Sequence, residues 1–101
     1  MPNQAQSVRD KFSENLRRVR AKRELSQEDL ARLTEMHRTE ISALERGRRE
    51  PRLRTLVKLS AVLEVPFSDL LEGIEWAPFT PSTVLPGHFH VSPPDDEAKS
   101  C

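Results

Sequence analysis

The side chains best suited to chemistry in this sequence lie in one short polar segment. The segment contains four residues that are one, three or four positions apart from each other: Arg38, Thr39, Ser42 and Ala43. In a helix, this spacing places them on one outward face. A guanidinium and two hydroxyl groups donate hydrogen bonds to acceptors such as phosphates and base edges. No nucleophile with an adjacent base accompanies them. The segment therefore favours binding over catalysis.

The charges are unevenly distributed along the chain, although the total is zero. Residues 1–60 carry 15 Lys and Arg residues against 9 Asp and Glu residues, a net charge of +6, whereas residues 61–101 carry −6. A basic half attracts an anionic polymer, and an acidic half limits non-specific binding. Two solvated faces of opposite sign are the plainer interpretation of the same distribution.

Other kinds of site have little support. His88 and His90 would share a strand face, but neither they nor His37 has a third ligand, and zinc needs at least three protein ligands. Cys101 alone cannot form an internal disulfide. No catalytic triad, Gly-rich phosphate loop or carboxylate pair is apparent. We therefore expect no enzyme, cofactor or metal, and the lack of a signal peptide or an apolar run of ~20 residues predicts a cytoplasmic protein.

Two short helices must position the polar segment. Ser26 is a suitable N-cap for a helix over about Gln27–Thr34. Gly47 ends a second helix over about Arg38–Arg46, because glycine adopts the left-handed C-cap without strain. The connection of three or four residues forces the helices to cross steeply, and such a unit can insert its second helix into a DNA major groove. Four apolar residues would fill the hinge between them: Leu30, Ala31, Ile41 and Leu44.

Three further helices flank this pair. Ser7 is an N-cap candidate for a first helix over about residues 8–23, which has an apolar stripe. A fourth helix over about residues 52–64 is apolar nearly all round, which predicts burial on most sides, either centrally or against a partner. A short fifth helix covers about residues 67–73, after Pro66. The sequence thus predicts an all-α fold with five helices.

The C-terminal part has a different character. Five prolines within residues 78–94 exclude a helix. Thr83–Leu85 and Phe89–Val91 could be short strands flanking a Pro86–Gly87 turn, and Trp76 and Phe79 are expected to pack on the helical core or on a dimer partner. We expect a flexible arm at residues 1–6, a helical domain at 7–74, and a Pro-rich extension, partly extended or disordered, at 75–101.

The order of these segments resembles the phage repressor and Cro-type helix-turn-helix family, also called the xenobiotic-response-element family. The resemblance is carried by Leu25–Ala31 and His37–Gly47, and by Pro51–Leu59 and Val65–Leu71, which are similar to the family's fourth and fifth helices. It extends over about residues 12–72. It implies a five-helix, repressor-like domain that binds double-stranded DNA, usually as a homodimer on a palindromic operator.

The resemblance also implies roles for individual residues. Four residues of this sequence match, or lie next to, the positions at which the family reads DNA bases: Arg38, Thr39, Ser42 and Ala43. Arginine can bond both O6 and N7 of guanine, and a Thr or Ala methyl group can touch a thymine methyl. Phosphate contacts are implied for Gln27, His37, Arg46, Arg48 and Arg49, and Gln27 would also buttress the recognition helix. Arg20 and Glu45 match a pair that ties the first helix to the end of the third. Dimer contacts are expected at Phe67, Leu70, Leu71, Ile74 and Trp76.

Three positions depart from the family pattern. Glu24 and Glu35 stand where the family usually has glycine, at the ends of the first and second helices. A left-handed conformation costs a non-glycine residue roughly 1–2 kcal/mol, so we expect an adjusted turn. His37 replaces a small N-cap, and Glu35 and Glu40 add negative charge near the predicted DNA surface.

The leading hypothesis is a sequence-specific transcription regulator, associated with the nucleoid, whose partner is double-stranded DNA. A second hypothesis is a protein-interaction adaptor that keeps the fold but does not read DNA. An antitoxin, whose extension would bind a toxin or another partner protein, is a variant of the first. The two classes differ in whether Arg38 and Thr39 are needed for function.

Overall fold

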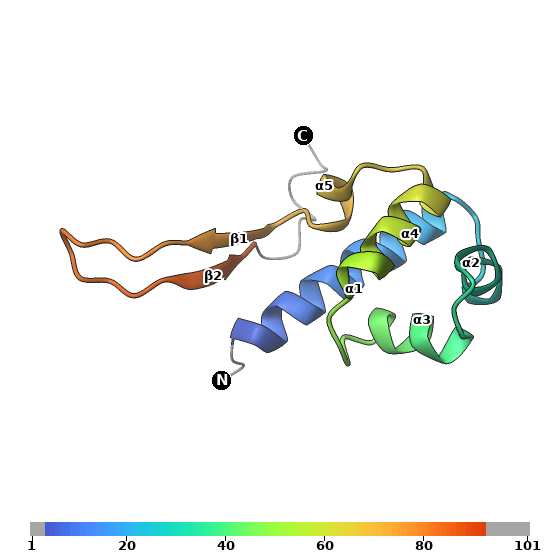
Figure 1. Cartoon of the computed structure of the whole chain (residues 1–101), viewed down its shortest axis with the longest axis horizontal. Helices are drawn as coiled ribbons and strands as arrows, with labels where there is room; N and C mark the ends of the chain where they lie inside the picture. The colour runs from blue at the N-terminus through green and yellow to red at the C-terminus, as the bar shows by residue number, and fades with distance from the viewer. Residues whose placement is uncertain (1–3, 93–101) are drawn as a thin grey trace.

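The computed structural model describes residues 4–92 of the chain. Five helices form a rounded body, and a two-stranded sheet projects from it (Figure 1). The helices are α1 (Gln4–Lys22), α2 (Gln27–Thr34), α3 (Arg38–Glu45), α4 (Leu53–Leu63) and α5 (Phe67–Leu70). The strands are β1 (Ile74–Ala77) and β2 (His88–Val91). The five predicted helices are therefore confirmed.

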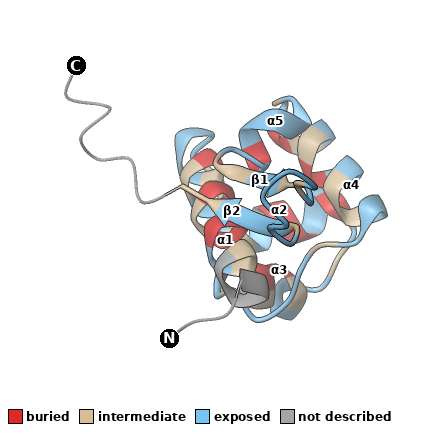
Figure 2. Ribbon diagram, turned by 90° about the vertical axis from the view of Figure 1, so that its left-hand side faces the viewer, coloured by how far each residue is buried: buried red, intermediate tan, exposed pale blue. Residues whose placement is uncertain are grey.

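The core lies where α1 meets the other helices. Phe12 and Leu16 come from α1 and are 2% and 0% exposed, because residues four apart line one face of a helix. All four predicted hinge residues of α2 and α3 are also buried. Leu59, Leu63 and Leu70 complete the core from α4 and α5. The crossing of α2 and α3 is thus fixed by apolar packing beneath both helices (Figure 2).

A buried polar side chain links α1 to the end of α5. Asn15 is completely buried, and its Nδ2 donates hydrogen bonds of 2.9 Å to the carbonyl oxygens of Leu70 and Glu72. These carbonyls follow the last turn of a short helix and have no partner further along it. Asn15 therefore holds the segment from which the sheet departs.

Three helices differ from their predicted extent or burial. α1 begins at Gln4, so Ser7 lies within the helix instead of capping it, and α1 includes part of the segment expected as a flexible arm. α4 is not buried on most sides, since Leu53 and Val57 are 79% and 48% exposed. The buried stripe of α4 is narrow because α4 packs on the body along one side only. α5 ends at Leu70 rather than near residue 73.

The ends of α2 and α3 confirm one expectation and correct another. Gly47 follows α3 with φ +71°, and the Arg48 N–H donates to the Ala43 carbonyl at 2.9 Å, as in a glycine C-cap. The turn after α2 is not adjusted for its missing glycine. Glu35 itself adopts the left-handed conformation, with φ 59° and ψ 43°. Glu24 and Glu64 do the same after α1 and α4.

The fold is not strictly all-α, because β1 and β2 pair as an antiparallel hairpin, Ile74↔Val91 to Ala77↔His88. The prediction of a strand at Phe89–Val91 is confirmed within β2. A strand at Thr83–Leu85 is wrong: residues 81–84 form the turn, and Leu85 makes only an isolated bridge to Thr80. Prolines at positions 78, 81 and 86 interrupt regular pairing, since proline has no N–H to donate. Residues 1–3 and 93–101, the ends of the predicted arm and extension, lie outside the described residues.

Candidate nucleic-acid interface

The polar face of α3 is open to solvent. Arg38 and Thr39 are exposed in the first turn, and Ser42 and Ala43 are half-buried one turn further on. The opposite face of α3 holds Ile41, Leu44 and Glu45, which are buried against the body. All four predicted base-reading residues therefore lie along the outward edge of one short helix.

A chain of hydrogen bonds connects this edge to the interior. The Arg38 guanidinium donates from Nη1 to Oε1 of Gln27 at 3.2 Å. Gln27 in turn donates from Nε2 to Oε1 of Glu45 at 3.0 Å. Gln27 thus lies between the exposed cation and a carboxylate that is only 2% exposed. This arrangement matches the buttressing role that the sequence implied for Gln27, while one Nε2 hydrogen remains to reach an anion.

The buried carboxylate of Glu45 is paired with Arg20. Arg20 donates from Nη2 to Glu45 Oε1 at 2.9 Å and from Nε to Oε2 at 2.5 Å, a two-pronged contact. The hydrogen bond with Glu45 raises the pKa of Arg20, so the guanidinium stays charged. Arg20 also donates to the Leu25 carbonyl at 2.8 Å, which ties together α1, the start of α2 and the end of α3.

Arg17 reinforces the same junction, although the sequence did not single it out. Its Nη1 donates to the backbone carbonyl of Glu45, the last residue of α3. A cation at this end is favoured by the helix dipole. The available signal was its position three residues before Arg20, which brings both arginines to one side of α1.

The start of α2 is fixed by a capping box. The Ser26 hydroxyl accepts from the Asp29 N–H at 2.9 Å, and the Asp29 carboxylate accepts from the Ser26 N–H at 3.2 Å. Hydrogen bonds from the Ser26 backbone and side chain, followed by one from Arg32 at 3.0 Å, hold the pKa of Asp29 below its usual value. Gln27, the first residue of α2, therefore has a defined backbone position next to Arg38.

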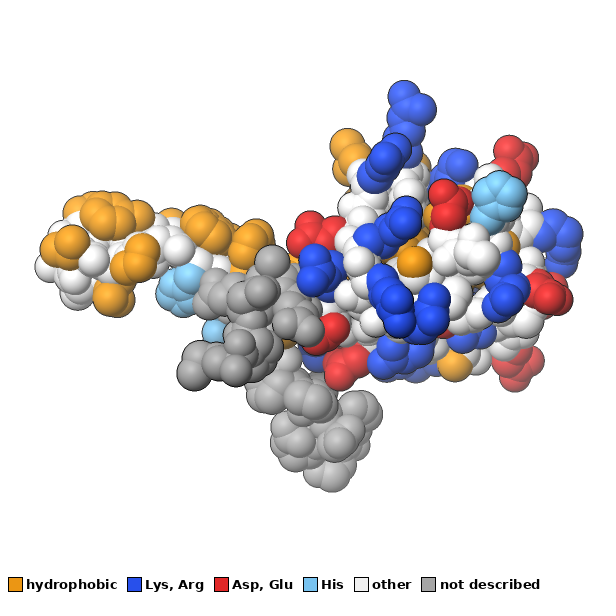
Figure 3. Space-filling model, turned by 90° about the horizontal axis from the view of Figure 1, so that it is seen from below, with side chains coloured by type: hydrophobic (Ala, Val, Ile, Leu, Met, Phe, Trp, Pro, Cys, Tyr) orange, Lys and Arg blue, Asp and Glu red, His pale blue; other side chains and the backbone are white. Residues whose placement is uncertain are grey.

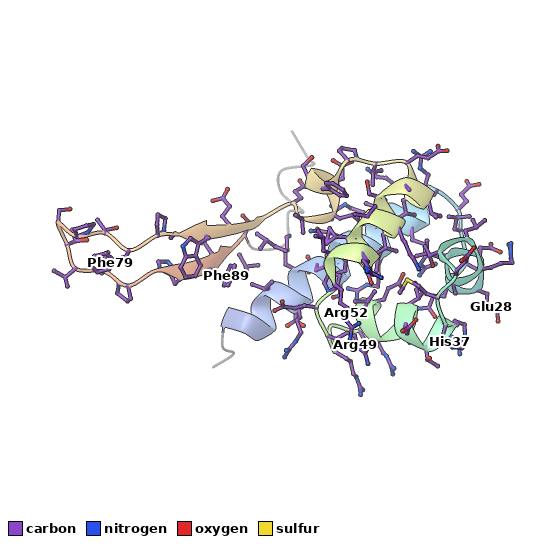
Figure 4. All side chains as sticks on the ribbon, viewed as in Figure 1. Glu28, His37, Arg49, Arg52, Phe79 and Phe89 are labelled. Atoms are coloured by element: carbon purple, nitrogen blue, oxygen red, sulfur yellow. The ribbon has the colours of Figure 1, made fainter. Side chains whose placement is uncertain are left out.

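Further cations surround α3. Arg46, Arg48 and Arg49 are exposed at its C-terminal end, and Arg52 follows before α4. Lys and Arg side chains gather over the face of the body in Figure 3, and Figure 4 labels Arg49, Arg52 and His37 near α3. Among the nearby acids, Glu40 accepts from the His37 N–H at 3.1 Å and so caps α3. Every residue predicted to contact phosphate is at least partly accessible.

The residues predicted to form a dimer contact do not all reach the surface. Leu70 is completely buried in the core, so its assignment as a dimer contact is wrong. Ile74 is partly buried and packs against the same core. Phe67 and Leu71 are 47% and 39% exposed. Trp76 is 56% and Phe79 55% exposed, so the expectation that they pack on the helical core is also wrong, and packing on a dimer partner remains a prediction.

Two other kinds of feature are absent from the described part of the chain. Residues 4–92 contain no group of three or more His, Cys, Asp or Glu side chains arranged to hold a metal ion. No helix within these residues is long and apolar enough to cross a membrane.

Known proteins resemble this chain over the helical body. A family model described as helix-turn-helix matches residues 16–70. The uncharacterized HTH-type transcriptional regulator YqaE of Bacillus subtilis is 39% identical over 62 residues, which cover 61% of this chain and 53% of that protein. Control protein C.BamHI of Bacillus amyloliquefaciens is 40% identical over 67 residues, which cover 65% of this chain and 83% of that protein. The aligned part of the chain therefore spans about half the length of the Bacillus subtilis relative.

Solved structures give the same result. The restriction-modification controller protein C.AhdI from Aeromonas hydrophila superimposes with a TM-score of 0.59 at 35% identity, over 61% of this chain and 94% of that chain. The hypothetical transcription factor NHTF from Neisseria superimposes with a TM-score of 0.61 at 35% identity, over 70% of this chain and 80% of that chain. Since the family model also spans more than half of the sequence, this chain belongs to the helix-turn-helix family of the phage repressor type, the xenobiotic-response-element family.

Proposed function

We propose that this protein is a transcription regulator that binds a specific double-stranded DNA sequence with α3 in the major groove. The observation that carries the proposal is the exposed Arg38–Ala43 edge, anchored to the core through Gln27 and Glu45. An anchored guanidinium loses less conformational entropy on binding and presents its donors in one direction. Relatives that are described as transcriptional regulators support the same assignment.

The proposal assigns different tasks to the two groups of residues. Arg38, Thr39, Ser42 and Ala43 contact base edges, where their chemistry distinguishes one base pair from another. Gln27, His37, Arg46, Arg48 and Arg49 contact the phosphates and set the register of the protein on the duplex. The regulator acts as a homodimer on a palindromic operator, with its two recognition helices about 34 Å apart, one turn of DNA. This function requires the protein to be in the cytoplasm with the nucleoid.

The test is a footprint of the full chain on the DNA upstream of its own gene. Specific binding protects one or two short segments at moderate salt, and the protected segments contain related half-sites about one helical turn apart. The matched control is Arg38→Ala with Thr39→Ala, which removes base contacts but leaves the cations that contact phosphate. Uniform weak protection by the unsubstituted protein, indistinguishable from that by the control, would reject sequence-specific binding.

A further inference from the structure

The projecting hairpin (residues 74–91) has one apolar and one polar face. It is called the arm from here on and is distinct from the flexible N-terminal arm that was expected at residues 1–6. Residues paired across an antiparallel sheet point to the same face, and residues two apart on a strand share it. Ile74 with Val91 and Trp76 with Phe89 therefore lie on one face. Glu75 with His90 and Ala77 with His88 lie on the other face, and three of these four side chains are polar. The arm is amphipathic in the way expected of a sheet that covers something.

The described part of the chain leaves much of the apolar face uncovered. Trp76 and Phe89 are 56% and 42% exposed, and Leu85, which its bridge to Thr80 places on the same face, is 55% exposed. About half of ~150–250 Å² for each of the two rings amounts to roughly 200 Å². With Leu85 added, that area approaches the largest apolar patch on a typical monomer. A two-stranded hairpin alone is also marginally stable in water, so we expect the arm to pack against a partner.

The arm is built to present its rings. The Trp76 and Phe89 ring centroids lie 5.0 Å apart in an edge-to-face contact. The Trp76 ring also lies against Gly87, where a Cβ atom would come within 2.4 Å of its Cζ2 atom. Pre-organised aromatic side chains of this kind lose little entropy on binding. Figure 3 shows the arm as a run of hydrophobic side chains that extends away from the charged body.

DNA and the chain's own ends do not fit this surface. No Lys or Arg occurs from residue 59 to residue 98, so the arm lacks the cations that neutralise phosphates. Residues 1–7 and 93–101 contain no aromatic residue and no Leu, Ile or Val. The cover must therefore come from another apolar protein surface.

A second copy of this chain supplies such a surface. On the body, Leu53 and Val57 of α4 are 79% and 48% exposed, and Phe67 and Leu71, at and just after α5, are 47% and 39% exposed. α5 ends at Leu70 and the arm begins at Ile74, so Phe67 and Leu71 lie close in the chain to the base of the arm. In a two-fold dimer each protomer contributes both its arm and its receiving surface. The buried apolar area per protomer then doubles to roughly 400 Å², close to the apolar share, a little over half, of the ~800 Å² per partner of a stable interface.

We propose that the apolar face of the arm, centred on Trp76 and Phe89, docks onto the exposed apolar residues of α4 and α5 of a second copy, and that the second arm docks reciprocally. This inference deepens the proposed function, because it rests on that function's dimer and names the surface that forms it. The arm of each chain does not cover its own α3, since it projects from the body on the side away from α2 and α3 (Figure 1).

Trp76 is the only tryptophan in the chain and provides a direct probe. Its emission wavelength and its quenching by acrylamide are measured on the full chain over a dilution series, alongside the molecular mass from analytical ultracentrifugation. The inference predicts that Trp76 becomes more quenchable, and its emission shifts to longer wavelength, over the same concentrations at which the dimer dissociates. A dimer whose Trp76 stays equally quenchable, or a chain that stays monomeric at all concentrations, overturns the inference.

Substitutions on the two faces of the arm provide a matched comparison. Trp76→Ser and Phe89→Ser each raise the dimer dissociation constant about tenfold or more, as expected for aromatic residues at the centre of an interface. Glu75 and His90 are on the same strands but on the polar face. Glu75→Ser and His90→Ser therefore change the dimer dissociation constant less than about twofold. Equal effects from both faces contradict the proposed docking. Circular dichroism of each variant checks that the helical body remains folded.

The same variants separate this inference from the proposed function. Trp76→Ser keeps its affinity for a DNA half-site and loses affinity for a full operator, because each protomer retains its own α3. If the unsubstituted chain forms a dimer with a protected Trp76 but binds no specific DNA, the proposed function fails and the arm inference stands. If it binds specific DNA while Trp76 stays unprotected in the dimer, the arm inference fails and the function stands.

Discussion

Arg38 Nη1 lies 3.2 Å from Gln27 Oε1, and this hydrogen bond joins the exposed edge of α3 to the first residue of α2. Gln27 is bonded to the buried carboxylate of Glu45, so the Arg38 guanidinium is positioned by the core rather than by solvent. Positioning and stability are therefore linked at Glu45, and the two effects can be separated by substitution.

Loss of the buried carboxylate is expected to destabilise the protein. Glu45→Ala leaves Arg20, which is 19% exposed, without its carboxylate partner, and removal of one partner of a buried pair costs about 3 kcal/mol or more. Urea unfolding followed by circular dichroism measures the change. The matched control, Glu50→Ala, removes an exposed carboxylate from the loop before α4 and alters stability by less than about 0.5 kcal/mol.

An apolar replacement of the whole pair separates stability from positioning. Arg20→Met with Glu45→Leu removes both charges, and such replacements of buried pairs are often neutral or stabilising. We expect the double variant to regain most of the lost stability but to bind its operator more weakly, because Gln27 loses its acceptor. Full operator affinity in a stable double variant would show that the Gln27–Glu45 contact does not position Arg38.

The glutamate after α2 stores strain that glycine would relieve. Glu35 has φ 59°, which costs a side-chain-bearing residue roughly 1–2 kcal/mol, and its charge lies at the negative end of a helix dipole. Glycine also increases the entropy of the unfolded chain, so Glu35→Gly should stabilise the protein by a net ~0.5–1 kcal/mol.

The control for this substitution is Glu28→Gly. Glu28 lies in the first turn of the same helix, in a right-handed conformation, where glycine costs about 1 kcal/mol. Thermal unfolding of both variants compares the two signs directly. A loss of stability in both would mean that the left-handed conformation at position 35 carries no strain.

The capping box of α2 gives the stability a defined dependence on pH. Hydrogen bonds from Ser26 and then Arg32 lower the pKa of Asp29 in the folded state. Its contribution is therefore fully present above the ordinary aspartate pKa of about 3.9 and is lost as pH falls through the lower folded value. The difference in unfolding free energy between the unsubstituted protein and Asp29→Asn should be constant from neutral pH down to about pH 3.9 and then narrow as pH falls to the lower folded pKa of Asp29. Parallel curves down to pH ~2 would contradict the assignment.

Local signals in the sequence were sufficient to predict the central part of the fold. Ser26 and Gly47 mark helix boundaries by backbone chemistry that acts over a few residues, and α2 has the predicted bounds. The buried hinge followed from the same periodicity. Gln27 and Arg38 were both identified as site residues, but their hydrogen bond depends on how α2 crosses α3, which no local pattern encodes.

The sequence was less informative where long-range packing decides the structure. β1 was missed because Ile74–Ala77 is short and gains its strand conformation only by pairing with β2, eleven residues further on. The burial of Leu70 and the exposure of Leu53 depend on which side of α4 and α5 meets α1. Glu35 adopts a left-handed conformation that is unfavourable for a residue with a side chain. The packing of α2 against α3 outweighs this local cost of ~1–2 kcal/mol.

The most direct test of the central claim is selection of bound DNA from a random library by the full chain, by Arg38→Ala and by Arg48→Ala. A base-reading Arg38 predicts that Arg38→Ala relaxes the preference at one position of each half-site, a contact worth about 1–3 kcal/mol. A phosphate-binding Arg48 predicts an unchanged sequence preference, with binding weaker on all sequences and a salt dependence shallower by about one counterion. The same change of preference in both variants, or none in either, would contradict the proposed role of α3.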